Sequence, residues 1–109
     1  MWKAELLPIF TASVAFNANE EKWIVDEAVL TSGFSKIVLV IYADQSSATD
    51  GLKIHQSADG TNWHITALTV TAGTVLAATV DVIPDRFRIS YKNGANATTV
   101  SFGVFLKRS

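Results

Sequence analysis

Hydrophobic and polar residues alternate along most of this chain with a period of two residues. From residue 52 to residue 57, Leu52, Ile54 and Gln56 alternate with charged or polar residues. Such alternation is typical of a β-strand with one buried face. The same pattern predicts further strands over residues 11–16, 22–30, 34–43, 74–83, 86–92 and 98–107, with a loop over 44–50. Another strand begins at Trp63, and residues 66–71 either continue it or begin a separate strand.

Residues 58–61 supply the chemistry of a tight turn, because they include Asp59 and Gly60. A four-residue loop there would set the register of a hairpin, since loop length decides which residues face each other. In that register Ile54 lies opposite Ile65 on the core side, and Trp63 shares their phase. His55 then lies opposite His64 on the outer side.

The fold class follows from the spacing of these segments. About eight strands, separated by turn signals roughly every ten residues and without a convincing helix, indicate an antiparallel β-sandwich. Eight strands favour a jelly-roll-like arrangement. We therefore expect an all-β protein with one sandwich domain over residues 17–109, preceded by an N-terminal arm and first strand over residues 1–16.

The first ten residues allow two interpretations. They mix large apolar side chains with Lys3 and Glu5, and Pro8 excludes them from a central strand. They form either an edge strand on the core or an arm that packs on a partner chain. The candidate partner-binding residues are Trp2, Leu6, Leu7, Ile9, Phe10 and Trp23.

Composition excludes several functional classes. The chain has 109 residues, a net charge of −1 and only 17% charged residues, with Lys and Arg dispersed, so we expect no nucleic-acid binding. There is no cysteine, which excludes disulfides and thiolate zinc sites. The longest apolar run, residues 37–43, is too short to span a bilayer.

The two histidines are the strongest candidates for chemistry. Side by side, His55 and His64 could hold a metal ion, but zinc needs three or four ligands and the chain has no third histidine. No nucleophile motif accompanies them. We expect no metal site, no cofactor, no catalytic residue and no enzyme activity.

The tryptophans could act as sugar-stacking platforms or as anchors of a protein interface. Trp63 is expected in the core because of its phase with Ile65. Trp23, on an edge strand beside acidic residues, is the better candidate for an exposed aromatic.

Four motifs resemble segments of small β-sandwich proteins encoded by tailed bacteriophages. QSADGTNW at residues 56–63 resembles their hairpin signature, and ADQS at residues 43–46 their preceding loop. RFRISYKNG at residues 86–94 resembles a late strand of theirs. Residues 97–107 resemble the threonine-rich link and the last strand, ending in a basic residue, that follow in those proteins. The resemblance covers residues 34–107, about two thirds of the chain, and leaves the N-terminal segment unmatched.

This resemblance implies a non-enzymatic structural protein of the virion, assembled in the host cytoplasm. Capsid decoration, also called cement, is the leading role, with the major capsid protein or other virion proteins as partners. An accessory position on the tail or baseplate is the alternative, and so is a carbohydrate-binding adhesion module with a glycan partner. The resemblance also implies a homo-oligomer, with a trimer favoured.

Overall fold

Eight β-strands make up the fold. The structure, a computed structural model, describes residues 6–30, 34–83 and 86–108, with the backbone alone for residue 6 and residues 27–30. No helix in this described part of the chain has the length and apolarity needed to cross a membrane. The strands are β1 (Leu6–Phe16), β2 (Glu21–Leu30), β3 (Lys36–Ala43), β4 (Ser47–Ser57), β5 (His64–Leu68), β6 (Leu76–Asp81), β7 (Arg86–Asn93) and β8 (Thr98–Lys107).

The strands pair like a long antiparallel ribbon that is folded back on itself. β1 pairs with β8, β2 with β7, β3 with β6 and β4 with β5. Contacts of β3 with β8 and of β4 with β7 join these pairs into two four-stranded sheets. The first sheet has the order β1-β8-β3-β6 and the second the order β2-β7-β4-β5. This is the connectivity of a jelly-roll sandwich, which confirms the predicted fold class.

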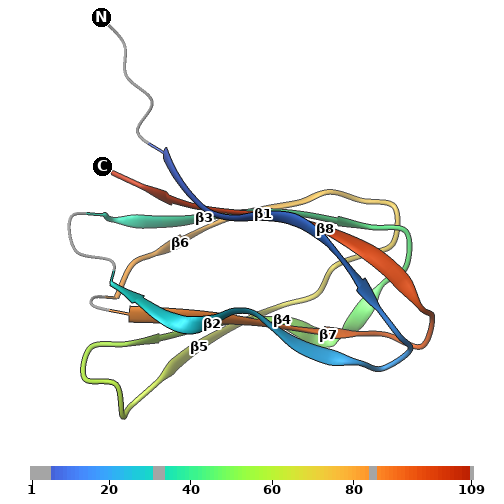
Figure 1. Cartoon of the computed structure of the whole chain (residues 1–109), viewed down its shortest axis with the longest axis horizontal. Helices are drawn as coiled ribbons and strands as arrows, with labels where there is room; N and C mark the ends of the chain where they lie inside the picture. The colour runs from blue at the N-terminus through green and yellow to red at the C-terminus, as the bar shows by residue number, and fades with distance from the viewer. Residues whose placement is uncertain (1–5, 31–33, 84–85, 109) are drawn as a thin grey trace, which may run out of the picture.

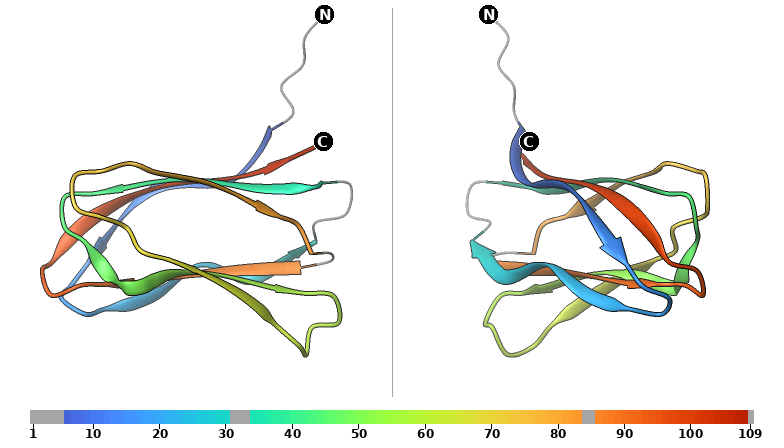
Figure 2. Two further views of the ribbon diagram at one scale, coloured as in Figure 1. Left: turned by 180° about the vertical axis from the view of Figure 1, so that it is seen from behind. Right: turned by 45° about the vertical axis from the view of Figure 1, so that its right-hand side comes forward.

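The two sheets lie face to face (Figure 1). Figure 1 looks onto the edge formed by β1 and β2, and the left view of Figure 2 onto the opposite edge formed by β6 and β5. The core fills the space between the sheets with alternate residues of the central strands. The fully buried large side chains include Ile37, Leu39 and Ile41 of β3, Leu52 and Ile54 of β4, Phe87, Ile89 and Tyr91 of β7, and Leu106 of β8.

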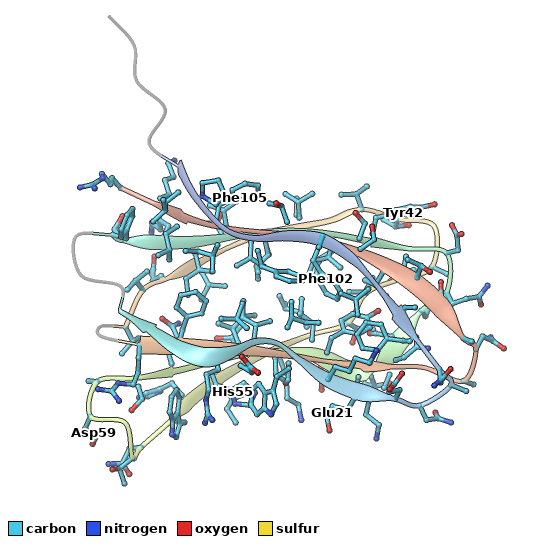
Figure 3. The ribbon with its side chains drawn as sticks, viewed as in Figure 1. Glu21, Tyr42, His55, Asp59, Phe102 and Phe105 are labelled. Carbon is cyan, nitrogen blue, oxygen red and sulfur yellow. The ribbon has the colours of Figure 1, made fainter. Side chains whose placement is uncertain are left out.

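An aromatic cluster joins the sheets at the core. Tyr91 of the second sheet meets Phe16 and Phe102 of the first, with ring centroids 5.0 and 5.4 Å apart. Phe10 approaches Phe102 at 6.1 Å. Figure 3 shows Phe102 between the two layers. The alternation over residues 86–92 and 98–107 predicts that every second residue of β7 and β8 packs inward, and the burial of these residues confirms it.

The N-terminal segment from residue 6 is an edge strand. β1 pairs with β8 alone, and its register shifts between Pro8 and Phe10. An edge strand tolerates proline because its second row of backbone groups has no partner strand. The sequence allowed either an edge strand or an arm that packs on a partner chain. Over residues 6–10 the structure shows the edge strand. Residues 1–5, including Trp2, lie outside the described residues.

β4 begins earlier than predicted. Residues 47–50 were expected in a loop, but β4 starts at Ser47. The backbone N–H of Ser47 donates to the carbonyl of Val70, and its hydroxyl accepts from the N–H of Val70, at 2.9 and 3.0 Å. A polar residue can belong to a strand when its backbone groups form hydrogen bonds with another segment. The hydrophobic pattern does not reveal such hydrogen bonds.

Gly103 lies where another side chain closes over the backbone. It faces outward on β8 opposite Val40, and a Cβ there would lie 3.1 Å from the ring of Phe105. The missing side chain leaves a gap on the outer face, and the Phe105 ring covers it.

Candidate functional site

The β4–β5 hairpin has a register that differs by one residue from the prediction. Ile54 lies opposite Thr66, and His55 lies opposite Ile65. A shift of one residue turns every side chain of a strand to the other face. Ile65, expected in the core, is therefore 56% exposed on the outer face.

The loop explains this difference, because it spans residues 58–63 rather than residues 58–61. The Asp59 carboxylate accepts hydrogen bonds from the backbone N–H groups of Thr61 and Asn62, both at 2.8 Å. It also accepts from the Asn62 amide and the Ser57 hydroxyl, at 2.8 and 3.0 Å. Gly60 takes a left-handed conformation, with φ 79°. These local bonds stabilise a wider loop than the hairpin pattern suggested.

The charge of Asp59 takes part in this network. Hydrogen bonds from the backbone N–H groups of Asn62 and Thr61, and then from the side chains of Asn62 and Ser57, hold its pKa well below the usual range. The loop therefore prefers the ionised carboxylate. Asp59 is a structural residue of the turn, on the outer side of the second sheet in Figure 3.

The predicted histidine pair does not form. His64 lies opposite Gln56, and the residue opposite His55 is Ile65. Among the described residues, no group of three or more His, Cys, Asp or Glu side chains could hold a metal ion.

A row of stacked side chains lies instead on the outer face of the second sheet. The guanidinium of Arg88 on β7 lies 4.2 Å from the ring centre of Trp63 and 4.9 Å from that of Trp23. Trp23 also meets His55, with ring centroids 5.0 Å apart. The expectation that Trp63 belongs to the core is therefore wrong. Because the loop is longer than expected, Trp63 lies on the outer face, beside Arg88.

A hollow of about 210 Å³ opens next to this row. It is lined by Glu21, Lys22 and Trp23 of β2, Lys53 and His55 of β4, and Ser90 of β7. The ladder explains why these residues meet, since Trp23 lies opposite Ser90, and Ser90 lies opposite Lys53. Ser90 is small and buried, so it forms the floor of the hollow. The larger side chains of β2 and β4 form the walls on either side of it.

His55 is held in place within the hollow. Its Nε2 lies 3.2 Å from the Ser90 hydroxyl. Burial lowers the pKa of His55, the positive charges of Arg88 and Lys53 lower it further, and Glu21 opposes them. The imidazole therefore favours its neutral form, in which one nitrogen donates a hydrogen bond and the other accepts one.

The predicted partner-binding residues whose side chains the structure describes do not form one surface. Ile9 and Phe10 pack against the core from β1, whereas Leu7 is 46% exposed at the start of that strand. Trp23 is also 46% exposed, but it lies on the second sheet. Trp2 and the side chain of Leu6 lie outside the described part of the chain. Sequence reasoning found Trp23 and missed its neighbours Arg88, His55 and Trp63 as members of one cluster.

One signal in the sequence pointed toward this cluster. The alternation of residues 86–92 placed Arg88 on the face away from the core, as the structure has it. Recognising its stacking partners required the correct hairpin register, which the pattern did not supply.

Comparison with protein families gives a match over residues 10–103 to the family described as "Uncharacterised protein YqxG N-terminal domain". The match covers more than four fifths of the chain. The chain belongs to this family. The region matched to the YqxG N-terminal domain runs from β1 into β8, so it includes the hollow and excludes Leu7 and Ile9. No curated protein matches the chain.

Proposed function

We propose that this protein is a non-enzymatic structural protein of a tailed-phage particle, which binds and stabilises the head as a decoration protein. The resemblance of its hairpin, late strand and last strand to phage β-sandwich proteins motivates the proposal. The observation that carries it is the outer face of the first sheet, which suits burial against a neighbouring subunit.

That face is apolar at its centre. Val40 of β3 is 42% exposed, and the Phe105 ring lies over Gly103, the residue opposite Val40, while Tyr42, 39% exposed, lies farther along β3 toward one end of the face. Figure 3 shows Tyr42 and Phe105 pointing away from the second sheet. Small and hydroxyl-bearing residues of β1 and β8 surround them, including Thr11, Ser13, Thr99 and Ser101.

Among the residues that the structure describes, the charged groups of this face lie at its ends. Lys36 forms an ion pair with Asp81 at one end, beside Lys107 of β8. At the other end the Tyr42 hydroxyl donates to the Asp44 carboxylate at 3.1 Å. Interfaces between proteins are typically depleted of charge at their centre and enriched in aromatic residues. The first sheet has this distribution.

Attachment of this kind needs no chemistry. A protein that binds only the assembled shell stabilises it by mass action, because the bound state is favoured over the separated parts. The proposal includes a trimer, as the resemblance implies, and a place in the virion. The same surface could serve on a tail or baseplate, and the particle fraction that binds the protein distinguishes these positions.

Co-sedimentation with heads that lack the protein tests the proposal. Val40→Asp places a charge at the centre of the first outer face and should abolish binding. Ile65→Asp places the same charge at an exposed position of the second sheet and should leave binding intact. If Val40→Asp binds heads as the unchanged protein does, the first sheet is not the attachment surface.

The N-terminal segment needs a separate variant. Deleting residues 1–10 would remove half of β1, so it confuses loss of an arm with loss of a strand. Deleting residues 1–5 leaves β1 complete. If this shorter deletion abolishes co-sedimentation while the fold is retained, the arm provides the anchor. Sedimentation equilibrium of the free protein tests the trimer.

A further inference from the structure

The outer face of the second sheet carries a binding site of a different kind. We propose that the hollow between Trp23, Lys53 and His55 binds an acidic sugar unit, a sugar ring that carries a carboxylate or a phosphate. This proposal does not depend on attachment through the first sheet.

The first part of the argument is the aromatic wall. The Trp23 indole is 46% exposed, and contacts to His55 and Arg88 hold it in position. The face of an aromatic ring is electronegative, so it attracts the weakly positive C–H groups of a sugar ring. A ring that is already fixed loses little conformational entropy when a ligand stacks on it.

The second part is the polar lining. Sugar hydroxyl groups both donate and accept hydrogen bonds, so a sugar site needs both kinds of partner. Glu21 supplies an acceptor and Lys53 a donor, from opposite sides of the hollow. His55 lies two residues from Lys53 on β4, and its ring nitrogen lies next to the Ser90 hydroxyl. Figure 3 places Glu21 and His55 on the same outer side of the second sheet.

The third part is the surplus of positive charge. Lys53, Arg88 and Lys92 all face outward around the hollow, and Glu21 is the only acidic residue among the six that line it. Lys22 is already engaged, since its ammonium donates to the carbonyl of Ala15 and lies 3.7 Å from Glu20. Lys53 and Arg88 have no ion-pair partner among the described residues. An anionic group on the ligand would compensate these charges by charge-assisted hydrogen bonds.

The size of the hollow narrows the ligand class. At about 210 Å³ it is smaller than the roughly 300–1,000 Å³ of typical pockets for small molecules and cofactors. It suits one sugar ring, with the rest of a glycan chain lying along the surface of the sheet.

Titration calorimetry with defined oligosaccharides tests the proposal. The probes are a glucuronic-acid oligosaccharide, a phosphate-bearing glucose oligosaccharide and a neutral glucose oligosaccharide of equal length. We expect binding of one or both acidic probes, at least about tenfold tighter than of the neutral one, and weaker binding at high salt. The two acidic probes distinguish a carboxylate from a phosphate ligand.

Variants locate the site. Trp23→Ala should weaken binding about tenfold or more, whereas Trp23→Phe, which keeps an aromatic face, should retain most of it. Lys53→Gln should remove most of the preference for the acidic probe over the neutral one. The matched control is Tyr42→Ala, an aromatic of similar exposure on the first sheet, which should leave binding unchanged.

Three results would overturn the proposal. One is no heat of binding with any acidic probe at millimolar concentration. Another is unchanged affinity in Trp23→Ala and Lys53→Gln. The third is equal binding of an acidic peptide such as oligoglutamate, which would assign the face to an acidic protein. Each result leaves the co-sedimentation experiment unaffected, because that experiment depends on the first sheet.

Discussion

The two sheets present very different outer faces to the surroundings. On the first sheet, Val40 and Phe105 form an apolar centre, Tyr42 lies toward one end, and charged residues lie at the ends. On the second, Arg88 is stacked between Trp23 and Trp63, with further basic residues around it. The strands of both sheets pair in the same antiparallel way and share one core.

This difference shows which positions the fold constrains. Inward positions of both sheets must be apolar, because they pack against each other across the sandwich. Outward positions have no such partner within the chain, so their chemistry can differ without changing the fold. The two faces are therefore where binding functions should be sought, and they can be altered separately.

Phe102→Ala should have the largest effect and should affect both faces together. The Phe102 ring contacts Phe10 and Phe16 of the first sheet and Tyr91 of the second, so its loss leaves a cavity in the shared core. We expect the free energy of unfolding to fall by about 3–5 kcal/mol in denaturant titration. The control Tyr42→Ala should change it by less than about 0.5 kcal/mol. If Phe102→Ala lowers the free energy of unfolding by less than about 1 kcal/mol, the aromatic cluster does not contribute substantially to the packing of the two sheets.

Gln56→Ala should come next, because Gln56 links the sheets with polar groups. Its buried amide donates to the carbonyl of Asp81 at 3.0 Å and accepts from the N–H of Ile83 at 2.7 Å. Removing it leaves backbone groups without partners, at a cost of about 1–3 kcal/mol in the free energy of unfolding. Gln45→Ala, which loses an exposed hydrogen bond to Asn96, should cost less than about 0.5 kcal/mol. Equal losses for the two variants would contradict this role.

Arg88→Ala should remove contacts on the outer face of the second sheet alone, since it takes a cation away from two aromatic rings. We expect the free energy of unfolding to fall by about 1 kcal/mol. Lys92→Ala, at an exposed position of the same strand, is the control and should have little effect. A double-mutant cycle of Arg88→Ala with Trp63→Ala should give a coupling energy of about 0.5–1 kcal/mol. Coupling indistinguishable from zero would show that the stacked row adds no stability.

Asp59→Asn should have the smallest effect, and one that depends on pH. The pKa of Asp59 is lowered in the folded protein, so its carboxylate stabilises the fold above its unfolded pKa of about 4. That contribution is lost as the pH falls through the lower, folded pKa. The melting temperature of the unchanged protein should therefore exceed that of Asp59→Asn at pH 7, and the two should converge in strong acid. A difference that is the same at pH 7 and pH 2 would exclude ionisation as its cause.

The sequence by itself determined the strands and their inward faces. Alternation placed Phe87, Ile89 and Tyr91 in the core, and the spacing of turns predicted an eight-stranded jelly roll. These features are local, because each residue of a strand points to the side opposite its neighbours. The outward position of Arg88 followed from the same rule.

Only the tertiary structure decided the candidate site. The hydrogen bonds of Asp59 widen the hairpin loop, which shifts the register by one residue, separates His55 from His64 and brings Trp63 out to Arg88. The hollow combines residues of β2, β4 and β7, which are far apart in the chain and meet only through strand pairing. Periodicity reports which face of its own strand a residue occupies. It does not report which residue lies across from it, because that depends on loop geometry and on the order of strands in the sheet.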